Sequence, residues 1–181
     1  MRKIILIAGP SGAGKTTISH YLQEKYQIPR VITHTTRPMR TDEDQQSYYF
    51  ETDRSFARLH FFEHVKYGAY QYGSSHEALN SAWQKNNIVS LIVDIAGVRS
   101  YLAALGKRVY FLYVTTSSPD ILRERLIHRG DKPETIKKRL SGKELNALPT
   151  DLRPQAHIIV NDHWQKTKNQ LDILINGLQK Q

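Results

Sequence analysis

A phosphate-binding loop stands near the start of the chain. Residues 9–16 read Gly-Pro-Ser-Gly-Ala-Gly-Lys-Thr, which is the complete pattern G-x-x-x-x-G-K-[ST]. In such a loop the glycines let backbone amides turn toward one phosphate, the lysine reaches the β- and γ-phosphates, and the next hydroxyl reaches Mg²⁺. The pattern therefore predicts a nucleoside triphosphate site in which Lys15 supplies the cation and Thr16 a metal ligand.

The residues on either side of the loop are those that the motif requires. Residues 3–8 form a continuous apolar and β-branched run, which is typical of a strand buried on both faces. Residues 15–25 carry apolar side chains at helical spacing, and a helix N-terminus adds partial positive charge at the phosphate. The alternative, a glycine turn that matches the pattern by chance, would not need a strand and a helix beside it.

Composition narrows the class of protein. The 181 residues suit about one domain, and the absence of cysteine excludes disulfides and cysteine-based metal sites. The N-terminal apolar run is too short for a secretory signal or a membrane span, so we expect a cytoplasmic protein without a membrane partner. The net charge of +9 is spread along the chain without a basic tract, which favours substrates with several phosphates over nucleic acid.

Strands and helices alternate at both ends of the chain but not in the middle. Further core strands are predicted at residues 88–94, 108–114 and 156–160, with helices near 97–105, 119–128 and 163–179. Residues 33–87 have shorter periodicity and many Tyr, Thr and charged residues, which indicates a small α+β insertion. We therefore predict an α/β fold with a parallel sheet flanked by helices, a core of residues 1–32 and 88–181, and an inserted region of residues 33–87.

Asp94 follows the apolar run of residues 88–93. A parallel sheet presents the carboxyl ends of its strands to a ligand, so this carboxylate is a candidate for contact with Mg²⁺ or with substrate. It could equally be the N-cap of a helix that begins near Ala96. The sequence by itself favours neither role.

Six further motifs resemble those of guanylate kinases and stand in the same order along the chain. They are Thr33-His34-Thr35-Thr36-Arg37-Pro38-Met39-Arg40, Tyr48-Tyr49-Phe50, Phe61-Phe62-Glu63, Tyr72-Gly73-Ser74, Arg125-Leu126-Ile127-His128-Arg129-Gly130 and Val160-Asn161-Asp162. With the phosphate-binding loop they cover nearly the whole chain. The resemblance implies a P-loop enzyme with a GMP-binding insertion and a helical lid at about residues 128–145, which converts ATP and GMP to ADP and GDP with Mg²⁺.

The resemblance also implies the role of each matching residue. ATP would be bound by Gly9, Ser11, Gly12, Ala13, Gly14, Lys15, Thr16, Thr17 and Asn161. GMP would be bound by Thr33, Arg37, Arg40, Tyr48, Glu63, Tyr72, Ser74 and Asp94. The catalytic cations would be Lys15, Arg125, Arg129 and Arg139, and the metal would contact Thr16 and Asp94.

The residue types in the GMP motifs suit this chemistry. Arg37 and Arg40 each offer a planar fork of donors to a phosphate dianion. Glu63 accepts two hydrogen bonds, and guanine offers N1–H and N2–H₂ side by side, so the carboxylate would select guanine over adenine. The alternatives are that the two arginines form surface ion pairs with residues 42–44, that the tyrosines pack in strands, and that Glu63 is a solvated strand residue.

The candidate lid contains three arginines. Arg125 and Arg129 are four residues apart and so share one helix face, a glycine-containing break follows at residues 130–133, and Arg139 lies on the next helix. Cations that arrive as a lid closes would stabilise the charge of a phosphoryl group in transfer and exclude water. The alternative is a charged, solvated helix face.

The chain departs from the guanylate kinase pattern at several positions. Ile92 replaces the first acid of the strand at residues 88–94, His64 replaces Trp, and Gln71 replaces Tyr or Asn. If the missing acid helps to hold Mg²⁺, turnover would be slow or would rely on Asp94. A kinase of another phosphate ester, such as a ribose bisphosphate, and a non-catalytic guanylate-kinase-like binding module are the alternative functions. The sequence does not give the oligomeric state.

Overall fold

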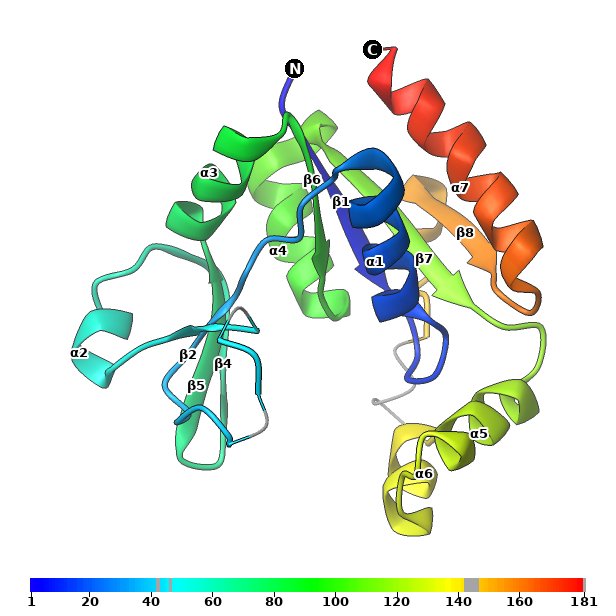
Figure 1. Cartoon of the computed structure of the whole chain (residues 1–181), viewed down its shortest axis with the longest axis horizontal. Helices are drawn as coiled ribbons and strands as arrows, with labels where there is room; N and C mark the ends of the chain where they lie inside the picture. The colour runs from blue at the N-terminus through cyan, green and yellow to red at the C-terminus, as the bar shows by residue number, and fades with distance from the viewer. Residues whose placement is uncertain (42, 46, 142–146, 181) are drawn as a thin grey trace.

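A four-stranded parallel sheet forms the centre of the molecule (Figure 1). The computed structural model describes residues 1–41, 43–45, 47–141 and 147–180. The sheet has the order β6-β1-β7-β8, formed by β6 (Ile88–Ile92), β1 (Lys3–Ala8), β7 (Val109–Thr115) and β8 (Ala156–Val160). Every pairing is parallel, so the carboxyl ends of all four strands meet at one edge.

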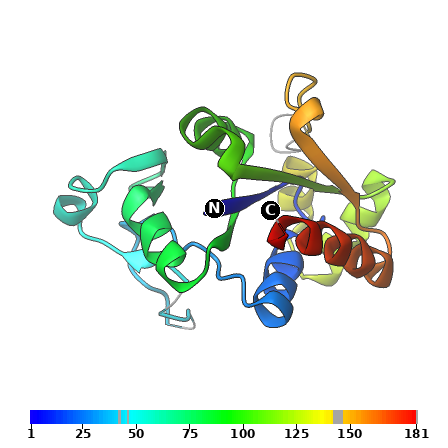
Figure 2. The same ribbon diagram turned by 90° about the horizontal axis from the view of Figure 1, so that it is seen from above.

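Helices cover both faces of this sheet. Alternate side chains of β1 enter two separate apolar clusters, one containing Ile4 and Leu6 and the other Ile5 and Ile7. The first cluster is covered by α3 (His76–Lys85) and α4 (Ile95–Leu105), and the second by α1 (Lys15–Tyr26) and α7 (Trp164–Gln179). Figure 2 shows α4 on one side of the sheet and α1 and α7 on the other. The predicted α/β fold with a parallel sheet flanked by helices is thereby confirmed.

A second, mixed sheet lies beside the first (Figure 1). Its order is β3 (Tyr49–Phe50), β2 (His34–Thr35), β5 (Tyr70–Ser75) and β4 (Phe61–Tyr67), with the short helix α2 (Asp53–Phe56) between β3 and β4. Phe62 of β4 stacks on Tyr101 of α4 with ring centroids 4.2 Å apart, which ties this sheet to the core. Helix α3, within the predicted insertion, buries its apolar face in the same cluster as β1.

Two helices project from the core, one that leads into the segment predicted to be a lid and one within it (Figure 1). Helix α5 (Pro119–His128) and helix α6 (Pro133–Arg139) are separated by Gly130, whose φ of 83° is the left-handed conformation that favours glycine. The rest of the predicted lid, residues 142–145, lies outside the described residues. Short 3₁₀ helices η1 (Gly106–Arg108) and η3 (Arg153–Gln155) precede β7 and β8. No described helix is long and apolar enough to cross a membrane.

Candidate nucleotide-binding site

The phosphate-binding loop connects β1 to α1 and depends on glycine at two close contacts. Gly9 has a φ of 141°, and a Cβ there would overlap the carbonyl group of Val114 on β7. Gly14 has a φ of 97°, and a Cβ there would overlap the side-chain amide of Asn161. The loop therefore fits against β7 and the end of β8 only because both positions lack a side chain.

A cavity of about 740 Å³ opens beside this loop. The residues that line it come from the loop, from α1, from α5 and from the start of α7: Ser11, Gly12, Gly14, Lys15, Thr16, Thr17, Arg125, Leu126, Arg129, Asn161, Asp162 and Trp164. The cavity thus joins most of the predicted ATP-binding residues to two of the predicted lid arginines. We call it the donor cavity.

Lys15 is held inside its own loop. Its Nζ donates to the carbonyl oxygens of Gly9 and Pro10, each at 2.8 Å. Burial, together with the positive charges of Arg129 and Arg139, lowers the pKa of this ammonium group to about 8. A phosphate brought among these three cations would relieve their repulsion, so the cluster favours an anionic ligand.

Asn161 fixes the loop from behind. Its side-chain Nδ2 donates to the carbonyl oxygen of Ala13 at 2.8 Å, and its Oδ1 accepts from Thr167 Oγ1 of α7, also at 2.8 Å. Only 4% of Asn161 is exposed, so its amide positions the backbone that would meet the phosphates. Thr167 and the cavity-lining Trp164 were not predicted as site residues, because neither belongs to a local sequence pattern.

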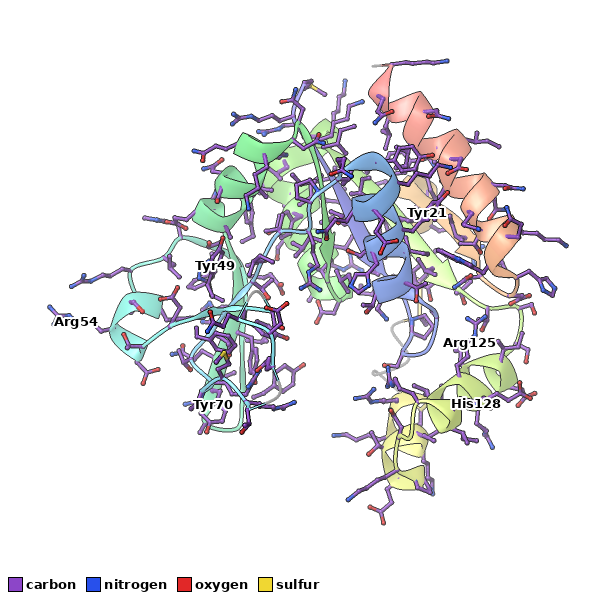
Figure 3. All side chains as sticks on the ribbon, viewed as in Figure 1. Tyr21, Tyr49, Arg54, Tyr70, Arg125 and His128 are labelled. Carbon is purple, nitrogen blue, oxygen red and sulfur yellow. The ribbon has the colours of Figure 1, made fainter. Side chains whose placement is uncertain are left out.

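The predicted lid arginines are all engaged. Arg125 on α5 donates through Nη2 to the carbonyl oxygen of Asn161 at 2.7 Å, which ties α5 to the core (Figure 3). Arg129 donates to both carboxylate oxygens of Asp131, at 2.8 and 2.6 Å, and Arg139 lies 3.1 Å from the same carboxylate. Asp131 therefore holds Arg129 and Arg139 together, and the charges of both arginines act on Lys15.

Arg37 lies just after β2 of the second sheet and forms an ion pair. Its Nη2 donates to Oε1 and Oε2 of Glu43 at 2.7 and 2.8 Å, and its Nη1 donates to the carbonyl oxygen of Pro38 at 2.7 Å. The rings of Tyr48 and Phe50 lie 5.7 and 5.8 Å from the guanidinium carbon. Of the ion pairs considered with residues 42–44, this one is present, while Asp42 is outside the described residues. Arg40 is exposed.

The predicted base-binding residues meet between β4, β5 and the start of α4. Glu63 Oε1 accepts from Ser74 Oγ at 3.3 Å. Burial raises the pKa of Glu63, and the negative charge of Asp94 raises it further. Gly97 of α4 leaves room for this carboxyl group, since a Cβ there would come within 3.1 Å of Glu63 Cδ. Glu63 is therefore a half-buried carboxyl group whose charged form hydrogen-bond donors would stabilise.

Asp94 acts as a helix cap in this structure. Its Oδ1 accepts from the backbone nitrogen of Gly97 at 2.8 Å, at the N-terminus of α4, as one of its two predicted roles required. The same carboxylate influences Glu63, so Asp94 belongs to the acceptor side and is absent from the lining of the donor cavity.

The other predicted acceptor residues lie on the same small sheet. The rings of Tyr48 and Tyr72 meet edge to face at 6.1 Å, and the backbone carbonyl of Thr33 accepts from Tyr49 N at 2.9 Å. His34, for which no role was predicted, is buried between Glu51 and Ser75, with ring nitrogens 2.9 Å from Glu51 Oε1 and 2.8 Å from Ser75 Oγ. It holds β2 against β5 and so fixes the strand from which the segment with Arg37 departs.

The residues present suit Mg²⁺ that arrives with a nucleotide. Among the described residues no three His, Asp or Glu side chains gather as a metal site. Mg²⁺ typically takes one or two protein ligands and completes its shell with water and substrate phosphates. The exposed hydroxyl of Thr16, at the first turn of α1, is a ligand of that kind.

Comparison with known proteins identifies the family. A sequence model of guanylate kinase matches residues 1–178. The chain belongs to the guanylate kinase family. It is 33% identical to the guanylate kinase of Helicobacter hepaticus over 187 aligned residues, which cover 98% of this chain and 92% of that one. It is 32% identical to human guanylate kinase over 168 residues, which cover 87% and 84% of the two chains.

A solved structure of the same family has the same fold. The crystal structure of guanylate kinase from Anaplasma phagocytophilum matches with a TM-score of 0.64 at 19% sequence identity, over 99% of this chain and 87% of that one. Family membership makes this chain an enzyme that transfers phosphoryl groups to nucleotides.

Proposed function

We propose that the enzyme transfers the γ-phosphoryl group of Mg²⁺-bound ATP to GMP and forms ADP and GDP. The observation that carries the choice of acceptor is Glu63, a half-buried carboxylate beside Ser74 and Gly97. Guanine N1–H and N2–H₂ would donate to its two oxygens and offset the cost of its burial. Adenine presents an acceptor at N1, which would face the carboxylate unfavourably.

The donor end binds and orients ATP. Lys15 would exchange the carbonyls of Gly9 and Pro10 for the β- and γ-phosphates, and Thr16 would hold Mg²⁺. Mg²⁺ held there would supply positive charge that neutralises the phosphates. Asn161 keeps the loop backbone in place during the exchange through its bond to Ala13.

The acceptor end positions the nucleophile. Arg37 and Arg40 would hold the GMP phosphate, with the hydroxyl groups of Tyr48 and Tyr72 as further donors. An oxygen of this phosphate attacks the γ-phosphorus while the bond to the bridging oxygen of ADP breaks. The monophosphate dianion is already a nucleophile, so no general base is required and catalysis is mostly positioning and charge.

The lid arginines would act on the transferring group. Arg129 lines the donor cavity, and the charges of both Arg129 and Arg139 act on Lys15. Negative charge spreads over the γ-phosphoryl oxygens as the bond to ADP breaks, and these guanidinium groups would stabilise it. Arg125 would anchor α5 to the loop through the Asn161 carbonyl.

A coupled assay of ADP release tests the proposal. The purified enzyme is supplied with Mg²⁺ and ATP and with GMP, dGMP, AMP, CMP, UMP or ribose phosphates in turn. We expect GMP to give the highest kcat/KM. A preference for AMP or for a ribose phosphate would contradict it, and omission of Mg²⁺ should abolish turnover with every acceptor.

A further inference from the structure

We call the second sheet and the segment with Arg37 and Arg40 the acceptor region. It already contains an anion beside these arginines, the carboxylate of Glu43. The Glu43 carboxylate receives two hydrogen bonds from Arg37 Nη2, and its Oε2 also accepts from the backbone nitrogen of Arg40 at 3.3 Å. The two residues proposed to bind the acceptor phosphate therefore converge on one carboxylate. Both partners of the ion pair are largely buried, with 10% of the Arg37 side chain and 15% of the Glu43 side chain exposed.

Local structure holds Glu43 at this place. The backbone nitrogen of Glu43 donates to the carbonyl oxygen of Arg40 at 3.2 Å, which holds the backbone of Glu43 beside Arg40 while its side chain meets Arg37. The bonds from Arg37 lower the pKa of Glu43, so the group is a carboxylate at neutral pH. Its two oxygens offer Arg37 the same kind of acceptors that a phosphate would offer.

We propose that Glu43 is an internal competitor of the acceptor phosphate, which must displace it from Arg37 in order to bind. This inference rests on the proposed function. A phosphate dianion carries more charge than a carboxylate and has three acceptor oxygens, so it can replace Glu43 at Arg37. The displaced carboxylate would turn away from the site with the loop that carries it.

Competition by Glu43 would lower the affinity for every ligand that binds through a phosphate by the same factor. A ligand that binds through its phosphate alone, such as inorganic phosphate, would then bind very weakly. GMP would still bind, because guanine adds its contacts at Glu63. The return of Glu43 to Arg37 would also favour release of the GDP product. Glu43 thus sets the affinity of the acceptor site without touching the base.

A purely structural role for Glu43 predicts the opposite result. If the carboxylate only orients Arg37 and holds the backbone nitrogen of Arg40, its loss would weaken the binding of GMP. Glu43→Gln separates the two roles, since glutamine has nearly the same shape and keeps an oxygen for Arg40 N but carries no charge. Asp44→Asn is the matched control, because it removes one negative charge at the next position.

Calorimetric titration of GMP, inorganic phosphate and guanosine into the three proteins tests the proposal. We expect Glu43→Gln to lower the Kd of GMP about tenfold and that of inorganic phosphate by a similar factor. The Kd of guanosine, which has no phosphate, should stay within about twofold, and Asp44→Asn should leave all three nearly unchanged.

Three results would overturn the competition. They are weaker or unchanged GMP binding by Glu43→Gln, an equal change for guanosine, and an equal change in Asp44→Asn. Thermal melting of each variant checks that the fold is intact. Failure of the proposed function is distinguishable, because the wild-type protein would then bind GMP no better than AMP.

Discussion

The donor and acceptor regions prepare their phosphate-binding cations in different ways. Lys15 of the donor loop is held by two neutral carbonyl oxygens, whereas Arg37 of the acceptor region is held by the Glu43 carboxylate. The donor loop is shaped by glycine backbone that fits against β7 and Asn161. The acceptor region relies on side-chain bonds across a small sheet, such as those of His34.

This difference suggests that the proposed ATP site is preformed, whereas the proposed GMP phosphate site must break an ion pair when it binds. The partners of Lys15 are neutral, so a nucleotide that displaces them meets a cation without breaking an ion pair. In the proposed reaction, a monophosphate that binds Arg37 would have to break the ion pair with Glu43. Arg129 and Arg139 resemble Arg37 in this respect, because both contact Asp131. The arginines of the second-sheet region and of the predicted lid are thus paired with carboxylates, while Lys15 of the core is paired with neutral carbonyl oxygens.

Removal of Lys15, which tests the proposed ATP site, should have the largest effect on kcat. Lys15→Ala removes the cation of the loop and should lower kcat by about a thousandfold. Its melting temperature should stay close to that of the wild type, since the lysine repels Arg129 and Arg139. Steady-state kinetics measure the loss, with Lys85→Ala on the exposed end of α3 as a control. Activity near that of the wild type would remove the loop from the mechanism.

Removal of Arg40 tests the acceptor half. Arg40→Ala should raise the KM for GMP between about 10- and 100-fold, because one charged contact to the phosphate is lost. The KM for ATP should change less than about twofold, since Arg40 is outside the lining of the donor cavity. Arg54→Ala on α2 removes a positive charge from the same region as a control (Figure 3). Equal effects on both substrates would mean that the two halves are not separate.

The pH dependence of kcat/KM should differ between ATP and GMP, although the effect should be smaller than that of the two substitutions. The pKa of Lys15 is lowered to about 8 in the free enzyme, so this cation is lost as the pH rises above 8. The kcat/KM for ATP should therefore fall above pH 8, by up to about tenfold at pH 9. At saturating ATP the phosphates restore the pKa of Lys15, and the kcat/KM for GMP should show no step near pH 8. An ATP profile that stays flat to pH 9 would contradict this account.

The core could be predicted from sequence because its signals are long and local. β1, β8 and α5 have the predicted bounds, and α4 begins two residues earlier than predicted because Asp94 caps it. The pairing of the second sheet could not be predicted. β2 and β3 have two residues each, too few to show a period, and β2 pairs with β5 about 37 positions later.

The site divides along the same line. The geometry of the phosphate-binding loop can be predicted from its motif, since the glycines of the motif set the backbone conformation. The contacts of Asn161 with Ala13 and Thr167, and of Glu63 with Ser74, join segments that only the fold brings together. The ion pair of Arg37 was considered from the sequence as an alternative to phosphate binding. In the structure Arg37, the arginine predicted to bind phosphate, forms this ion pair with Glu43. The ion pair and the predicted phosphate contact therefore involve the same guanidinium group.

The preference for guanine over adenine in Glu63→Gln tests the central claim most directly. The amide replaces one acceptor oxygen with a donor that faces a guanine donor, which should cost about 2–4 kcal/mol in kcat/KM for GMP. The low activity with AMP should fall less or rise. Glu77→Gln, the same change at an exposed carboxylate of α3, should preserve the wild-type ratio. The account predicts a collapse of the GMP to AMP ratio in Glu63→Gln, and a ratio that stays intact would contradict it.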